Sequence, residues 1–291
     1  QNLAVGFQAL LANTTGNFNT GTGVYSLYGN TTGSQNSAFG RSTLVVNTTG
    51  ANLTAIGYGA LYNNTTASNN TAVGFEAGYS NTTGLGLTAI GSGALYANTT
   101  GTRNTAVGSK QVGYTGAALT SNTTGDGNSA FGAGSLTTST TGSYNSAYGE
   151  ASLALTTTGQ YNTAVGAQAL FANTTASSNT AVGYQAAYAV TTSTNITAIG
   201  SLALQLGASG GNTTAIGASA LRNNAAGGVG NTAVGASALY ANTSGRDNVA
   251  MGTDISGTAS ESALSSNTTG SSNVAIGNSA LGKNTTASQN N

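Results

Sequence analysis

The chain lacks several residue types altogether, because its 291 residues include no cysteine, proline, tryptophan or histidine. Without cysteine, no disulfide framework and no thiolate metal site can form. Charged residues make up 4% of the sequence, against about 25% in a typical soluble domain. The six basic and six acidic residues cancel, which excludes the charged surface that binds nucleic acid or an anionic membrane. These absences argue against an ordinary globular domain.

The same absences leave little material for catalysis. Histidine and cysteine, the commonest general base and thiol nucleophile, are missing. The acidic residues are scattered over different repeats: Glu76, Asp126, Glu150, Asp247, Asp254 and Glu261. We therefore predict that the chain is not an enzyme and has no catalytic, cofactor-binding or metal site.

Long apolar runs are also missing. The longest, such as ALLA at 9–12, are too short to span a bilayer, so no membrane insertion is expected. No targeting segment is recognisable, and the start at Gln1 is typical of a processed or excised chain.

What the sequence does contain is one pattern repeated along its length. The glycine of AVG, or of a variant, recurs at 6, 23, 40, 57, 74, 91, 108, 132, 149, 166, 183, 200, 217, 235, 252 and 277. Twelve of the fifteen spacings are 17 residues, and the others are 24, 18 and 25. The consensus N-T-A-V-G-x-x-A-L-x-x-N-T-T-G-x-x has no helical apolar period. It predicts an all-β parallel β-solenoid (β-roll) of about 16 coils, as a single repeat domain over 1–291 with longer, loop-bearing repeats at 109–125 and 253–270.

Each coil should have two short strands, TAVG and ALY, with the NTTG segment as a corner. We assign the residue before the glycine, such as Val5 or Ile56, to the core. The alanine or glycine before it then faces outward by strand alternation, and its uniformly small size suggests that this face packs against another chain.

Leucine four residues after the glycine is assigned to the core, which places the next residue outside. Aromatic residues recur there, and this ladder either packs against a neighbouring chain or stacks on sugar rings as a ligand site. Its members are Tyr28, Tyr62, Tyr79, Tyr96, Phe171, Tyr188 and Tyr240.

The NTT segments allow two interpretations. They match the N-x-[ST] glycosylation motif, which makes Asn13, Asn30, Asn47, Asn64, Asn81 and Asn98 candidate glycan acceptors. Alternatively, stacked asparagine side chains form an amide ladder from coil to coil, which we favour. Regular threonine rows also raise ice binding as a minor alternative.

The inserted segments hold Lys110, Tyr114, Asp254 and Glu261, and are the best candidates for a specific contact.

The sequences NVAMG at 248–252 and NVAIG at 273–277 resemble the head repeats of YadA-like trimeric autotransporter adhesins. Related variants, NTAVG and LTAIG, are similar to repeats in some phage tail-fibre proteins. The resemblance implies a left-handed parallel β-roll, commonly trimeric, that serves adhesion on a cell or virion surface. The 17-residue period is longer than the usual adhesin head repeat, and no heptad stalk or membrane-anchor barrel is found in this sequence.

The two ends of the sequence complement each other. SQNN at 288–291 aligns with the segment before a strand, and Gln1–Gly6 supplies that strand. We therefore expect end-to-end assembly through Gln1, Asn2, Leu3, Ala4, Val5, Gln289, Asn290 and Asn291. The leading hypothesis is a non-enzymatic extracellular structural fibre subunit that stacks head to tail, with lateral association into a homopolymer or homotrimer. The alternative is an adhesin head or tail-fibre shaft fragment that binds a surface glycan or protein.

Overall fold

The computed structural model describes residues 1–110, 116–207, 210–224, 227–253 and 261–290, which form sixteen short strands and no helix. Accordingly, this part of the chain offers no helix able to cross a membrane. The strands are β1 (Leu3–Val5), β2 (Thr20–Thr22), β3 (Ser37–Phe39), β4 (Thr54–Ile56), β5 (Thr71–Val73), β6 (Thr88–Ile90), β7 (Thr105–Val107), β8 (Ser129–Phe131), β9 (Ser146–Tyr148), β10 (Thr163–Val165), β11 (Thr180–Val182), β12 (Ile196–Ile199), β13 (Thr213–Ile216), β14 (Thr232–Val234), β15 (Val249–Met251) and β16 (Val274–Ile276).

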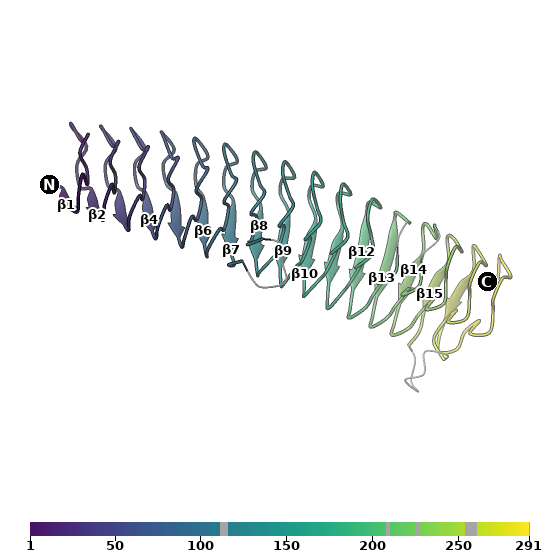
Figure 1. Cartoon of the computed structure of the whole chain (residues 1–291). Coiled ribbons are helices and arrows are strands. Elements are labelled where there is room, and N and C mark those ends of the chain that lie inside the picture. The colour runs from purple at the N-terminus through teal and green to yellow at the C-terminus, as the bar shows by residue number, and fades with distance from the viewer. Residues whose placement is uncertain (111–115, 208–209, 225–226, 254–260, 291) are drawn as a thin grey trace. The chain divides into compact units, whose positions relative to one another are not determined.

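The chain divides into two compact units, Gln1–Asn145 with β1–β8 and Ser146–Asn291 with β9–β16. In both units each strand pairs in parallel with the next one in the sequence (Figure 1). This arrangement confirms the predicted parallel β-solenoid with its 17-residue repeat, although each coil holds one strand and not two. The description of 1–291 as one domain stays a prediction.

The longer repeats keep the strand register. Thr105 of β7 pairs with Ser129 of β8, 24 residues later. In the second unit, Val249 of β15 pairs with Val274 of β16, 25 residues later. The additional residues therefore lie between strands, where an insertion leaves the backbone hydrogen bonds of the sheet intact.

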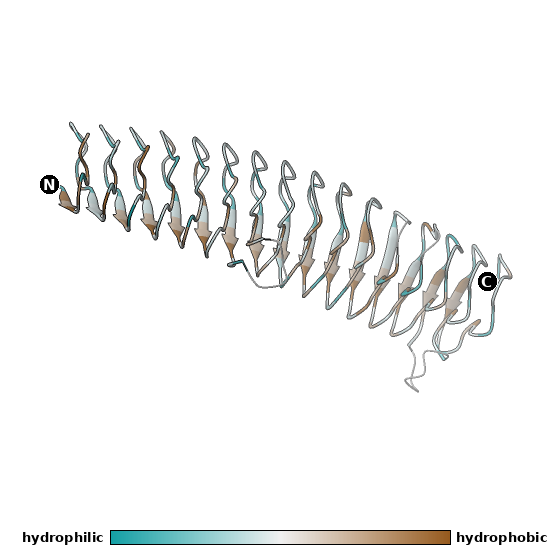
Figure 2. Cartoon of the chain, in the orientation of Figure 1, coloured by the Kyte–Doolittle hydropathy of each residue, from teal (hydrophilic) through white to brown (hydrophobic). Residues whose placement is uncertain are grey.

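The interior of each coil is filled by two columns of small and medium-sized side chains. The middle strand residue is buried in β2–β16, as Ala55 and Ala72 illustrate, and the leucine column is buried beside it. Our assignment of the strand residues was therefore inverted, because alanine faces inward and the following Val or Ile faces outward. Figure 2 shows that hydrophobic residues recur in the strands from coil to coil. The reason for the inversion is the limited space that the leucine side chain leaves inside the coil. A Cβ added at Gly21, an alanine-column position, would lie only 3.5 Å from Leu10 Cγ, so the leucine column leaves room for little more than a methyl group.

The ALY segment is a turn, so the prediction of a second strand was wrong. Leu61 has a φ of 50°, in the left-handed region, and its carbonyl accepts a hydrogen bond of 3.1 Å from Asn64 N. A left-handed conformation costs about 1–2 kcal/mol for a residue with a Cβ. Complete burial of a leucine side chain contributes about 1.5–3 kcal/mol, which offsets that cost at each coil.

The repeated glycine marks a close approach between coils. Gly57 has a φ of 119°, and a Cβ at this position would lie 2.5 Å from the carbonyl oxygen of Gly74 in the next coil. No other residue type fits there without displacing the backbone.

Candidate interaction surfaces

The asparagines of the NTT turns form a continuous amide ladder inside the first unit. Asn64 Nδ2 donates to Asn47 Oδ1 at 2.9 Å, and Asn81 Nδ2 donates to Asn64 Oδ1 at 3.0 Å. Each amide also donates to the carbonyl three residues later, as Asn64 does to Ala67 O at 3.0 Å. Among the candidate glycan acceptors, Asn13 is half-buried and the others are fully buried: Asn30, Asn47, Asn64, Asn81 and Asn98. The folded chain leaves these buried nitrogens no access for glycan attachment, and the ladder accounts for their burial.

A second asparagine column precedes the strands, and the sequence analysis missed it. Asn36 Oδ1 accepts a hydrogen bond of 3.1 Å from Leu53 N in the next coil, and Asn36 Nδ2 donates to Gly50 O at 2.9 Å. The first asparagine of the consensus N-T-A-V-G was the available signal. This column holds the backbone of one coil against the next at the start of each strand.

Two asparagine acceptors in the ladder column, one at the end of the run in the first unit and one isolated in the second unit, lack a partner within the described residues. They are Asn122 Oδ1 and Asn173 Oδ1. Seventeen residues after each, the sequence has Ser139 and Val190 in place of asparagine. A serine is too short to reach the amide oxygen and a valine has no donor, so neither oxygen receives a hydrogen bond from the next coil.

The threonine that follows each ladder asparagine is also used within the coil stack. Thr48 Oγ1 donates to Thr65 O at 3.1 Å, and Thr65 Oγ1 donates to Thr82 O at 3.0 Å. The next threonine, as at Thr49 and Thr66, is exposed. In the first row, Thr48 and Thr65 are half-buried and their hydroxyl groups already donate within the stack, which weakens the support for ice binding.

The third strand residue forms an apolar row on the outside, which we call the outer strand column. Ile56 is 41% exposed, Val73 is half-buried and Ile90 is 40% exposed. In the second unit Val165, Ile199 and Ile216 continue the same pattern. Apart from Thr22 in β2, the column carries an apolar or aromatic side chain in each strand, which is unusual for a surface in contact with water, so it is a candidate interaction surface.

The predicted aromatic ladder is present as stacked rings. The centroids of Tyr62 and Tyr79 lie 5.1 Å apart, those of Tyr79 and Tyr96 5.4 Å apart, and those of Phe171 and Tyr188 5.1 Å apart. Two members are exceptions. Tyr28 meets Tyr25 edge-on at 5.9 Å, and Tyr240 Oη accepts a hydrogen bond of 3.3 Å from Arg222 Nη1. What the ladder contacts stays a prediction.

Burial raises the pKa of Tyr79 above the usual value for tyrosine, and repulsion from the neighbouring Tyr62 and Tyr96 phenolates adds to the rise. The position of Tyr79 in the ladder therefore favours its protonated form.

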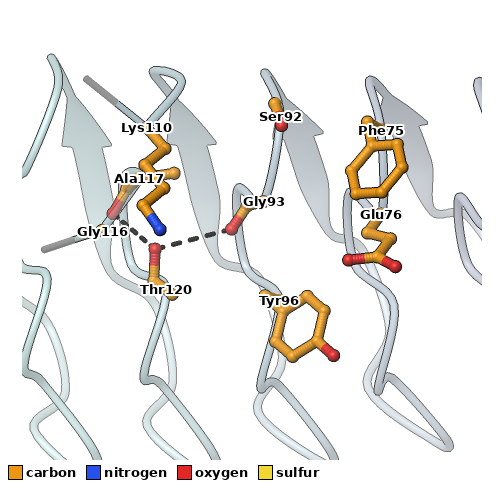
Figure 3. Close-up of a pocket in the computed structure, with 9 residues that line it drawn as sticks. All are labelled: Phe75, Glu76, Ser92, Gly93, Tyr96, Lys110, Gly116, Ala117 and Thr120. Carbon is orange, nitrogen blue, oxygen red and sulfur yellow. Dashed lines mark hydrogen bonds between the residues drawn. The ribbon is translucent and has the colours of Figure 1, made fainter. Parts of the chain in front are cut away.

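A hollow lies where the inserted repeat begins, beside Phe75, Glu76 and Lys110 (Figure 3).

Among the loop residues singled out from the sequence, Lys110 and Glu261 are exposed, while Tyr114 and Asp254 lie outside the described residues. Nowhere in the described ranges do three His, Cys, Asp or Glu residues lie close enough together to hold a metal ion.

The predicted end residues follow the geometry of the other coils. The first five, Gln1, Asn2, Leu3, Ala4 and Val5, are exposed, as is Gln289, and Asn291 lies outside the described residues. Leu3 N donates to Asn19 O at 2.8 Å, and Asn290 N donates to Asn273 Oδ1 at 3.0 Å. Asn290 thus continues the second asparagine column, as the sequence alignment predicted.

No protein-family model matches this chain, and no curated protein matches it closely enough to count as a relative.

Proposed function

We propose that this chain is a structural module of a fibre that associates side by side with further copies of itself. The observation that carries the proposal is the outer strand column. In nearly every coil it places an apolar side chain on the outside, as at Ile56 and Ile90, which are 41% and 40% exposed. Complete burial of such a side chain is worth about 1.5–3 kcal/mol, so covering the exposed part contributes about 1 kcal/mol per coil.

A second copy of the chain is the occupant that fits this column best. Two identical solenoids have the same rise per coil, so their columns stay in register over many coils. The net charge is zero and only 4% of residues are charged, so little like-charge repulsion opposes contact between copies. Because each coil adds a similar increment, the association strengthens with the number of coils engaged.

Charge placed on the column tests the proposal. The double variant Ile56→Lys, Ile90→Lys puts two ammonium groups on the column without touching the interior. The matched control Thr49→Lys, Thr83→Lys adds the same charge at exposed turn positions. In analytical ultracentrifugation of the full chain, we expect a multiple of 28.1 kDa for the unmodified protein and the control, and a monomer for the column variant. A monomeric unmodified protein, or an unchanged mass in the column variant, would refute the proposal.

Coaxial stacking of coils belongs to the same proposal and has its own test. Electron microscopy of the unfixed protein should reveal open-ended filaments, whereas discrete short rods would contradict stacking. A place on a cell or virion surface is likewise proposed, supported by the resemblance of NVAIG at 273–277 to adhesin head repeats.

Surface-glycan binding is the second candidate function. The stacked rings of Tyr62, Tyr79 and Tyr96 favour it, because aromatic faces suit the apolar face of a sugar ring. Binding of glycans to the full chain, lost when these three residues are replaced by alanine, would support it.

A further inference from the structure

In the first unit, a second column of the solenoid holds a pair of stacked aromatic rings, and the column continues from that pair with a serine. The residue after each repeated glycine is Tyr58 in one coil and Phe75 in the next, and their rings stack at 5.4 Å with an interplanar angle of 15°. In the following coil this position is Ser92, and Gly93 comes after it. Gly93 N donates to Phe75 O at 2.9 Å, so the coils are adjacent, and the column position next to Phe75 carries a serine instead of a ring.

The far side of this gap is closed by the next coil. Lys110 N donates to Ser92 O at 3.3 Å, which places Lys110 one coil beyond the serine. Phe75 and Lys110 therefore flank a slot that spans the coil of Ser92. Adjacent coils are about 4.8 Å apart, so the slot has the thickness of one flat ring.

The slot is part of a hollow of about 250 Å³ (Figure 3). That volume is below the range of about 300–1,000 Å³ that is usual for drug-sized ligands, and it suits a single ring. Besides the flanking residues, the lining includes Glu76, Tyr96 and Thr120. The Thr120 hydroxyl donates to Ala117 O at 2.7 Å, which leaves its oxygen free to accept.

The chemistry around the slot combines one apolar face with a polar rim. The Phe75 ring is 53% exposed and offers its face. The Glu76 carboxylate accepts hydrogen bonds, the Lys110 ammonium donates them, and the hydroxyl of Ser92 does both. A pyranose ring matches this arrangement, because it has an apolar C–H face and hydroxyl groups around its edge. A purely aromatic ligand would fill the slot but leave the rim unused.

We propose that this hollow is a saccharide subsite, in which one pyranose ring of a neutral glycan stacks on the exposed face of Phe75, beside Ser92. Its hydroxyl groups then bond with Glu76 and Lys110. The site is independent of the side-by-side association proposed above, because it lies on the residues that follow the repeated glycine and not on the outer strand column.

Filling the slot is the sharpest test. Ser92→Phe adds a ring at a column position where the same backbone already carries Phe75 and Tyr58. The matched control is Ser201→Phe in the second unit, where Tyr184 occupies the preceding coil and is also 53% exposed. There Leu202, rather than a glycine, follows the serine. Both variants add the same apolar ring to the surface, but only the first blocks the hollow.

The assay is saturation-transfer NMR on the full chain, with the methyl glycosides of glucose, galactose, mannose and N-acetylglucosamine as probes and phenol as an aromatic comparison. We expect at least one glycoside to bind with a dissociation constant of about 1–10 mM, as one ring and a few hydrogen bonds allow. Ser92→Phe should weaken that binding at least tenfold, and Ser201→Phe should leave it unchanged.

Two further variants test the polar rim. Glu76→Gln and Lys110→Gln should each weaken glycoside binding about tenfold, the loss expected for one hydrogen bond to a charged group. Glutamine is tolerated at the first position, because Gln185 holds the equivalent place with the same φ of 52°. The proposal is overturned if no glycoside binds, if phenol alone binds, if both phenylalanine variants act equally, or if neither rim variant changes the affinity.

Discussion

The substitution Asn64→Ala should destabilise the first unit strongly, because Asn64 lies fully buried in the middle of the amide ladder. Its Nδ2 donates to Asn47 Oδ1 at 2.9 Å and to Ala67 O at 3.0 Å. Alanine has no group that replaces either donor. Both acceptors are therefore left in the interior without the hydrogen bond that Asn64 supplies.

The cost follows from those two acceptors. Leaving one buried acceptor unpaired costs about 1–3 kcal/mol, so two cost about 2–6 kcal/mol. The donors on the other side of Asn64 lose less, since Asn70 Nδ2 and Asn81 Nδ2 each keep a hydrogen bond to Gly84 O. We therefore predict a loss of about 4 kcal/mol in the free energy of opening the coils around residue 64.

Hydrogen exchange read by mass spectrometry measures this loss locally, which matters because solenoids open in parts. Each 1.4 kcal/mol is a factor of ten, so protection in peptides covering 47–84 should fall by about a thousandfold. The control is Asn17→Ala, since Asn17 is exposed and its Nδ2 bonds only to Thr15 O within the described residues. That change should stay within about 0.5 kcal/mol. An effect of Asn64→Ala no larger than the control would refute the view that the ladder holds the coils together.

Three other predictions follow from single positions. Ser139→Asn should stabilise the chain by about 1–2 kcal/mol, because the new amide donates to Asn122 Oδ1, which has no partner among the described residues; an unchanged urea midpoint would count against it. The pKa of Tyr79 is raised in the folded chain above 10.0, so the unfolded chain loses that proton first. The contribution of the protonated Tyr79 to stability should therefore be fully present below about pH 10 and be lost as the pH rises through the folded pKa. Thermal unfolding at a series of pH values measures this loss, which should be smaller in Tyr79→Phe. Gly57→Ala should lower the free energy of unfolding by about 3 kcal/mol or more, because the new Cβ would lie 2.5 Å from a backbone oxygen. Gly59→Ala should lower it by only about 1 kcal/mol, because the nearest contact of its Cβ is at 3.4 Å. Equal urea midpoints for the two variants would contradict this reasoning.

The period and the strand pairing could be predicted because they depend on spacing alone. A parallel ladder needs equivalent residues at equal intervals, and the recurring glycine supplies that interval, as the pairing of Thr54 with Thr71 illustrates. The glycine itself was a good marker because the approach of neighbouring backbones excludes any Cβ there.

The inner and outer faces of the strand could not be predicted in the same way. Alternation shows that Ala55 and Ile56 point to opposite sides, but it does not say which side is enclosed. The larger residue was assigned to the core, as in a wide sheet sandwich. In this narrow coil the leucine side chain takes that space, and it comes from a left-handed turn at Leu61 that no local preference of leucine indicates.

The candidate surfaces were predicted unevenly for a related reason. The aromatic ladder was visible because Tyr62 and Tyr79 recur at the repeat spacing, whatever their surroundings. The saccharide subsite was not, because its signal is the absence of a ring at Ser92. That absence has meaning only once Phe75 and Lys110 are known to lie in the adjacent coils.

The amide ladder also gives the coil stack a direction. From Asn30 to Asn122, every Nδ2 of the ladder donates to the asparagine of the preceding coil, as Asn30 does to Asn13 and Asn122 to Asn98. The amide dipoles therefore add along the stack and polarise one another, as peptide dipoles do in a helix. A coil inserted in the opposite sense would set two carbonyl oxygens or two amino groups face to face. Duplication or deletion of whole coils preserves this alignment, whereas inversion of a single coil destroys it.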